Sequence, residues 1–279
     1  MFGLMIKQSG SLTMMHQYLS DKEFGKDGTY SIILPIDQGV EHGPVDAFTA
    51  SEHPEMLDVS YQIDYIAELL NDGLISGAAI PARVAKLFCK RYPDLASDIV
   101  VKLNHGNNLN NNLHPSQAVY ATSQEAKSFG AGCIGFTIYP GSFYQDQMIE
   151  SFAKARNNFH GKSILWSYPR GGDFNQTSTK TIMHAAYIAA QLNPSVIKVK
   201  LPTDQPANLE AAVHSVVKSA CGIPVVFSGG SKQSHQNILE EARAIKGGGG
   251  RGMIIGRNTF QRKPQDAKDL LNDIHEVFA

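Results

Sequence analysis

Few cysteines, few charged residues and no long apolar run distinguish this chain of 279 residues. Its cysteines, Cys89, Cys133 and Cys221, lie far apart, so they predict neither a disulfide framework nor a CxxC metal site. Charged residues make up 18% of the chain, below the roughly one quarter that is typical, so a disordered charged tail is not expected. The formal net charge of -1 argues against a protein that binds nucleic acid or acidic membranes.

The hydrophobic content is ordinary, at 42%, and it is spread along the chain. No apolar run approaches the roughly 18 residues that a membrane-spanning helix needs. Residues 1–15 lack the basic segment and the following long apolar stretch of a signal peptide. These absences predict a soluble, cytoplasmic, globular protein with no membrane partner and no nucleic-acid partner.

Short runs of β-branched and apolar residues recur after residue 29, and each is bounded by Gly, Pro, Asn or Asp, as strands commonly are. We expect strands at residues 31–37, 74–80, 98–104, 133–139, 163–168, 195–201, 223–229 and 252–256. Longer segments with helical spacing lie between them, at residues 56–73, 82–92, 116–130, 147–159, 179–192, 208–220, 237–248 and 267–278.

Alternation of eight strands with eight helices over about 250 residues favours a (β/α)8 TIM barrel. An open doubly wound sheet has the same alternation, but no GxGxxG motif follows the first expected strand. We therefore predict an α/β fold with one barrel domain over residues 30–279, preceded by an N-terminal extension over residues 1–29.

The expected strand over residues 195–201 carries two lysines on one face. Side chains alternate along a strand, so Lys198 and Lys200 share a face while the apolar Ile197, Val199 and Leu201 share the other. We expect the apolar face to pack against the surrounding helices, so the lysines on the opposite face point toward the barrel interior. A buried ammonium must be paired or lose its proton, and a neutral amine attacks carbonyl groups. The lysines are therefore candidates for a Schiff base, or alternatively for ion pairs or phosphate binding at the barrel mouth.

Aromatic and basic residues mark the end of the expected strand over 163–168. Trp166 and Tyr168 share a face, and we expect a nearby ammonium to lower the pKa of Tyr168, which would then act as a general acid–base. The alternative is an aromatic pair that only caps the core. Arg170, beside two glycines, suits recognition of a phosphate or carboxylate, although a surface ion pair is also open.

Glycine-rich segments follow the last two expected strands, SGGSK at 228–232 and IIGRN at 254–258. Phosphate-binding barrels commonly seat the phosphate on backbone N–H groups of these two loops. Glycine lets the backbone approach an anion closely. The pair of loops therefore predicts a phosphate site.

Neither metal chemistry nor serine hydrolase chemistry is predicted. The ten histidines form no HxH or HxxxH pair, and the chain has no GxSxG nucleophile motif.

Six motifs stand in order at the expected strand ends: ILPIDQGVEHGP (33–44), KLNHG (102–106), ILWSYPRGG (164–172), VIKVK (196–200), FSGG (227–230) and IIGRNTFQ (254–261). Together they resemble the motifs of the archaeal-type class I fructose-bisphosphate aldolases over nearly the whole barrel. The resemblance implies reversible cleavage of fructose 1,6-bisphosphate to glycerone phosphate and glyceraldehyde 3-phosphate, without a metal or other cofactor.

The resemblance also implies a role for each matching residue. Lys198 matches the Schiff-base lysine, Tyr168 the proton-transferring tyrosine and Asp37 the aspartate of the first strand. The remaining matches are expected to contact substrate: Trp166 as a substrate-lining residue, Arg170 and His42 at the distal phosphate, Ser228, Gly229, Gly230, Gly256 and Arg257 at the proximal phosphate, and Lys200 as an accompanying residue. Gln38 is also expected among the residues that bind the substrate or its phosphates.

One departure concerns the first motif. Many family members have Asp-His-Gly where this chain has Asp37-Gln38-Gly39, although bacterial members with Asp-Gln-Gly are familiar. Two alternatives therefore stay open: a related Schiff-base aldolase or acyl-transfer enzyme that acts on another phosphorylated ketose, and a non-catalytic protein that binds sugar phosphates. Members of the family commonly assemble into rings, so a homo-oligomer is expected.

Overall fold

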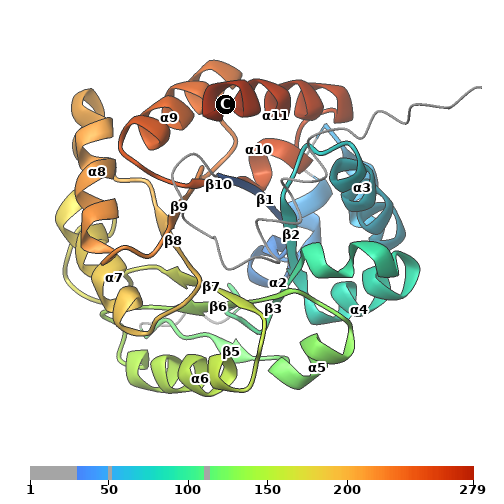
Figure 1. Ribbon diagram of the computed structural model, residues 1–279, viewed down its shortest axis with the longest axis horizontal. Coiled ribbons are helices and arrows are strands. Elements are labelled where there is room, and N and C mark those ends of the chain that lie inside the picture. Colours follow the sequence, from blue (N-terminus) through green and yellow to red (C-terminus); the bar gives the residue numbers. More distant parts are fainter. Residues whose placement is uncertain (1–29, 50–51, 110–113) are drawn as a thin grey trace, which may run out of the picture.

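Eight parallel strands close into a barrel in the computed structural model, which describes residues 30–49, 52–109 and 114–279 (Figure 1). Around the barrel the strands follow the order β1-β2-β3-β6-β7-β8-β9-β10, and β10 pairs with β1. Their bounds are β1 Ser31–Pro35, β2 Gly77–Pro81, β3 Ile99–Lys102, β6 Cys133–Ile138, β7 Lys162–Ser167, β8 Val196–Lys200, β9 Val225–Ser228 and β10 Gly252–Ile254. The predicted TIM barrel is confirmed, and each of its strands overlaps a segment expected to be one; β2 and β7 each extend one residue beyond it.

Helices surround this barrel as an outer ring (Figure 1). They are α3 Val59–Asn71, α4 Ala82–Arg91, α5 Ser123–Ser128, α6 Gln145–Asn157, α7 Thr179–Gln191, α8 Leu209–Ser219, α9 His235–Gly247 and α11 Pro264–Phe278. Side chains of Asp58, Ser178 and Ser234 accept hydrogen bonds at the starts of α3, α7 and α9, as expected of helix caps. Within the three described ranges, no helix is both long enough and apolar enough to cross a membrane.

Shorter elements occupy the connections. They are α2 Gln38–His42, η1 Val45–Thr49, η2 Pro54–Leu57, η3 Pro93–Asp98, η4 Pro206–Asn208, α10 Arg257–Phe260 and an antiparallel ribbon of β4 Asn104–His105 with β5 Ala118–Val119. Three of them, α2, the β4–β5 ribbon and α10, follow the carboxyl ends of β1, β3 and β10. They therefore lie at the end of the barrel where the candidate site residues were expected.

The helix expected over residues 116–130 is shorter than predicted. Residues Ala118 and Val119 form β5, and the backbone N–H groups of Tyr120 and Ala121 donate to the carbonyl of Leu103. The helix begins only after Thr122, whose side chain and that of Glu125 form a reciprocal capping box. Pairing with β4 thus fixes residues before Thr122 as extended chain, which helical spacing alone does not reveal.

Apolar residues fill two separate layers. Ile33, Val100, Ile164, Val196 and Ile254 come from five strands and form a small cluster inside the barrel. The larger cluster lies between the strands and the helices and includes Ile197 and Val199, the outward neighbours of Lys198 on β8. The alternation predicted for this strand is confirmed, because Lys198 lies on the interior face.

The N-terminal extension, residues 1–29, lies outside the described residues. The described barrel elements begin at Ser31 and end at Phe278.

Candidate active site

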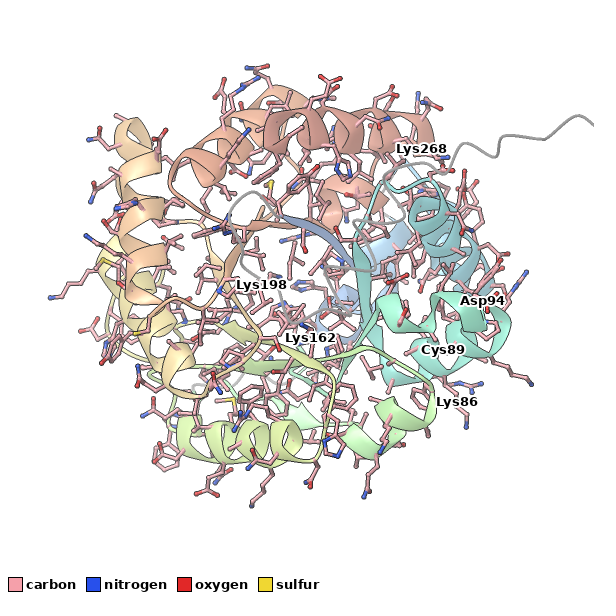
Figure 2. The ribbon with its side chains drawn as sticks, viewed as in Figure 1. Lys86, Cys89, Asp94, Lys162, Lys198 and Lys268 are labelled. Carbon is pink, nitrogen blue, oxygen red and sulfur yellow. The ribbon has the colours of Figure 1, made fainter. Side chains whose placement is uncertain are left out.

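A cavity of about 440 Å³ lies at the carboxyl ends of the strands. Every residue that the sequence proposed for the site lines this cavity. In Figure 2, Lys198 lies within the ring of strands, whereas Lys86 and Lys268 lie on the outer helices. The fold thus brings together residues from the first expected strand to the last, from Asp37 to Arg257.

Lys198 is buried in this cavity, with 6% of its surface exposed. It lies on β8 between Trp166 of β7 and Val226 of β9 in the strand register. Burial, together with the positive charge of Lys102, lowers the pKa of Lys198 to about 7, although Asp37 opposes the shift. A large share of Lys198 is therefore a neutral amine near pH 7, the form that attacks a carbonyl carbon.

Lys102 is a second buried amine in the same cavity, and it is only 2% exposed. Its Nζ donates to Thr137 Oγ1 at 2.7 Å and lies 4.1 Å from the centroid of the Trp166 ring. Lys198 Nζ lies 5.3 Å from the same centroid. Burial lowers the pKa of Lys102 to about 8, although Asp37 and Glu41 favour its charged form. The sequence analysis did not include Lys102 in the site.

Gly135 leaves space for the side chains of Lys102 and Trp166. Gly135 lies beside Lys102 in the β3–β6 register. A Cβ atom at residue 135 would lie 2.8 Å from Trp166 Cζ3 and 2.9 Å from Lys102 Cδ. The absence of a side chain there lets the tryptophan and the lysine meet inside the barrel.

Asp37 and Glu41 supply the negative charge that faces the amines. Asp37 follows β1, and Glu41 lies on α2. Both favour the charged forms of Lys102 and Lys198, and in each case Asp37 has the larger effect. Asp37 is therefore placed to stabilise a positive charge that develops on Lys198.

Tyr168 follows β7 directly, and its ring lies between the two lysines of β8. Lys198 Nζ is 5.4 Å and Lys200 Nζ is 5.9 Å from the ring centroid. The expected lowering of the pKa of Tyr168 is wrong: burial raises it well above its ordinary value, despite a hydrogen bond with Ser228, and Asp37 raises it further. Desolvation outweighs the nearby amines, so Tyr168 holds its proton and is a hydrogen-bond donor to a bound molecule.

The loop after β9 is held by side-chain donors that bind one of its backbone carbonyls. The Gly229 carbonyl accepts from Asn258 Nδ2 at 3.2 Å and from Gln233 Nε2 at 3.3 Å. In a planar trans peptide the carbonyl and the next N–H point in opposite directions. The Gly230 N–H therefore points away from Asn258. Gly230 has φ +64°, a conformation that glycine adopts without strain.

Asn258 ties the two glycine loops together. Its Nδ2 also donates to the Ser231 carbonyl at 3.0 Å, and its Oδ1 accepts from the Gln233 N–H at 2.7 Å. It is 1% exposed and belongs to α10, directly after Gly256 and Arg257. Asn258 was predicted only as part of the IIGRN motif, without a role of its own. Its contacts hold the loop after β9 against α10.

Three further basic side chains line the cavity, those of His42, Arg170 and Lys200. The Arg170 guanidinium lies 5.3 Å from the centroid of the Tyr139 ring. His42 Nδ1 accepts from Asn108 Nδ2 at 2.9 Å, so in the neutral imidazole the proton is on Nε2. Burial and the charge of Arg170 lower the pKa of Lys200. The cavity therefore holds basic side chains besides the two buried amines.

Metal binding finds no support in the described part of the chain, where no group of three or more His, Cys, Asp or Glu residues could hold an ion.

The family model for DeoC/LacD family aldolases matches residues 31–262. The chain therefore belongs to the DeoC/LacD family of aldolases, and it is an enzyme of the aldehyde lyase class.

Comparison with individual proteins shows which members of the family this chain is similar to. A class 1 fructose-bisphosphate aldolase of Thermoproteus tenax is 33% identical over 238 residues, which cover 84% of each chain. That of Halobacterium salinarum is 34% identical over 251 residues, 87% of this chain and 88% of the relative. The structure of a Schiff-base-forming fructose-1,6-bisphosphate aldolase is 29% identical, with a TM-score of 0.79 over 96% of this chain and 100% of that chain. These similarities confirm the resemblance to archaeal-type class I aldolases.

The charge of Lys102 should control the protonation of Lys198. In the variant Lys102→Met, removal of a neighbouring positive charge should raise the pKa of Lys198 by roughly one unit, equivalent to about 1.4 kcal/mol. We would measure the rate of reductive methylation of Lys198 against pH, with mapping by mass spectrometry. Lys200→Met is the control, because Lys200 is not among the charges that shift Lys198. An unchanged midpoint in Lys102→Met would refute this coupling.

Asn258 should matter for anion binding more than for folding. In Asn258→Ala, two backbone carbonyls lose a donor and the loop after β9 is free to turn. We expect the Kd for inorganic phosphate to rise about tenfold, or about 1.4 kcal/mol, by calorimetry. Asn237→Ala, on the exposed start of α9, is the matched control. Equal phosphate affinity in the two variants, with both folded by circular dichroism, would contradict the positioning role.

Proposed function

We propose that the protein is a class I fructose-bisphosphate aldolase that cleaves fructose 1,6-bisphosphate through an imine on Lys198. The observation that carries this proposal is a buried lysine whose pKa is lowered to about 7, beside a protonated phenol and between two anion-binding clusters. A substrate with a phosphate at each end and a ketone between them matches that arrangement. The names of the relatives describe the same activity for those proteins.

The first stage forms the imine. Neutral Lys198 Nζ attacks the C2 ketone, and loss of water leaves a protonated imine that withdraws electrons from C3. Asp37 stabilises this positive charge, because it favours the charged form of Lys198. The Trp166 ring, close to both buried amines, lines the path of the carbon chain.

The second stage breaks the carbon–carbon bond. Asp37 accepts the proton of the C4 hydroxyl, the C3–C4 bond breaks, and glyceraldehyde 3-phosphate leaves an enamine on Lys198. Tyr168, which is protonated because it is buried, then donates its proton to C3 and regains one from Asp37, so both groups return to their starting states. Hydrolysis of the imine then releases glycerone phosphate and restores the amine. Asp37 orients the substrate hydroxyls and assists proton transfer.

The two phosphates bind at opposite ends of the cavity. Ser228, Gly229 and Gly230, together with Gly256 and Arg257, hold the phosphate on C1. Arg170 and His42 hold the phosphate on C6, with Lys200 adjacent. Gln38, in place of the histidine of many family members, lies against Gly256: a Cβ at 256 would be 2.7 Å from Gln38 Nε2. Gln38 thus contacts substrate near the C1 end.

The proposal also covers the location of the enzyme in the cell and its assembly. We infer that it acts in the cytoplasm as a homo-oligomer, as expected from its composition and from the resemblance.

Borohydride trapping tests the imine directly. The protein is incubated with glycerone phosphate, reduced, and digested for peptide mapping by mass spectrometry. We expect one adduct, on Lys198, and none in Lys198→Met, because Lys198 is the amine with the pKa nearest 7 at this site. An adduct on Lys200 or Lys102 would keep the chemistry but reject the assignment. No adduct in a protein that binds glycerone phosphate would favour a non-catalytic binding protein.

Tyr168→Phe separates proton transfer from imine formation. Loss of a positioned acid–base group costs roughly 10²–10⁴ in rate, so we expect turnover of fructose 1,6-bisphosphate to fall at least tenfold. The adduct on Lys198 should still form, since attack by the amine does not need the phenol. Coupled assay of glycerone phosphate release measures turnover. Unchanged turnover would remove Tyr168 from the mechanism.

A further inference from the structure

A half-buried carboxylic acid, Glu241 of α9, lies beside the glycine loop that follows β9. It borders the catalytic cavity together with Gly229 and Gly230. A Cβ atom at residue 229 would lie 3.8 Å from Glu241 Oε2, so the carboxyl group is next to the backbone of this loop. No step of the proposed reaction uses Glu241, although it is an acid placed where a phosphate is expected to bind.

One oxygen of this carboxyl group has a hydrogen-bond donor and the other has none. Glu241 Oε1 accepts from Gln233 Nε2 at 2.8 Å, and the same Nε2 donates to the Gly229 carbonyl at 3.3 Å. Glu241 Oε2 is buried and has no hydrogen-bond partner among the described residues. Burial without partners destabilises a carboxylate much more than a neutral carboxyl group. These surroundings therefore favour the protonated form of Glu241.

The basic side chains around this loop are engaged elsewhere. Lys232 Nζ lies 3.4 Å from Glu52 Oε1. Arg262 donates to two backbone carbonyls, at 2.6 Å and 2.7 Å. Arg257 borders the cavity, where it is expected to contact the phosphate on C1. Each of them thus has a partner or an expected role other than neutralising Glu241.

The elements packed against α9 are α8, α11 and β10. Asp273 of α11 binds His235 at 2.7 Å, at the start of α9, and Glu210 of α8 lies beside Gly247, at its end. The strand β10 carries no charged residue. Two influences act on the pKa of Glu241: burial raises it, and the hydrogen bond from Gln233 partly opposes the shift.

A phosphate bound at the glycine loops brings negative charge close to this carboxyl group. A nearby negative charge disfavours the ionised form of an acid, so a bound phosphate favours protonated Glu241. Coupling between two binding equilibria is reciprocal, and ionised Glu241 must therefore weaken phosphate binding by the same factor. Gln233 joins the two sites physically, because one amide nitrogen binds both Glu241 and the Gly229 carbonyl.

We propose that Glu241 couples phosphate binding at the glycine loops to the uptake of a proton, so that the loops bind a phosphate dianion more tightly when this carboxyl group is protonated. The inference rests on the proposed function, which assigns the phosphate on C1 to these loops. The proton comes from solvent, and no covalent bond of the ligand changes. Since protonation is lost as the pH rises, the contribution of Glu241 weakens binding on the alkaline side of its pKa.

Sulfate is the probe, because it stays a dianion over the whole range in which a carboxyl group titrates. Its Kd is measured by calorimetry for the unaltered protein and for Glu241→Gln, which is uncharged and of the same size. At about pH 8 we expect sulfate to bind about tenfold more tightly to Glu241→Gln, and at about pH 5 the two Kd values should agree within about threefold. Glu240→Gln, on the exposed neighbouring residue of the same helix, should match the unaltered protein at both pH values.

Proton uptake gives a second readout. Titrations near pH 6 in two buffers of different ionisation enthalpy measure the number of protons taken up for each sulfate bound. This number should be lower in Glu241→Gln than in the unaltered protein and in Glu240→Gln, because the other titratable groups of the cavity are the same in all three proteins.

The outcomes separate the inference from the function on which it rests. Equal sulfate affinity of Glu241→Gln and the unaltered protein at about pH 8 overturns the inference. So does weaker binding in Glu241→Gln at both pH values, which is the result of a merely structural role. If that variant does not fold, Glu241→Met, also uncharged and of similar length, replaces it. Absence of fructose 1,6-bisphosphate cleavage by the unaltered protein would overturn the proposed function itself, whatever the sulfate affinities.

Discussion

The burial of two amines at one end of the barrel is the constraint on which the active site depends. Removing a charge from water costs several kcal/mol per ion even after relaxation, so burial lowers the pKa of both Lys102 and Lys198. The face of the Trp166 ring and the carboxylate of Asp37 partly offset this cost, because both stabilise a positive charge on the amines. The balance leaves the pKa of Lys198 at about 7, where the amine both attacks a ketone and carries a proton in the imine. Deeper burial without Asp37 would destabilise the positive charge of the protonated imine.

The same low dielectric acts in the opposite direction on Tyr168. Burial disfavours the charged form of any group, so it lowers the pKa of the amine and raises that of the phenol. Near pH 7 Tyr168 is therefore protonated and uncharged, and a large share of Lys198 is a neutral amine. When one environment shifts two pKa values in opposite directions, the two groups differ in whether they accept or donate a proton. One physical cause, exclusion of water from the barrel mouth, thus prepares both partners of the reaction.

Much of the fold and the site could be predicted from local patterns. The alternation in VIKVK turned Lys198 inward, and the glycine loops fell at the ends of β9 and β10. What failed depends on packing between distant segments. The role of Lys102 needs Trp166 and Thr137 from other strands. The raised pKa of Tyr168 needs the depth of its burial, which no spacing reveals. The helix expected from residue 116 was lost to pairing with β4, a contact outside the window in which helical periodicity is judged.

The residues that line the cleft come from two kinds of element, the barrel strands and the β4–β5 ribbon. The amines and Trp166 lie on paired barrel strands, whose register fixes their positions and leaves little freedom for change. The β4–β5 ribbon pairs only with itself, so substitutions there leave the register of β8 intact. Burial of Lys198 therefore depends on the barrel strands, and the ribbon borders the cleft through His105 and Ala118.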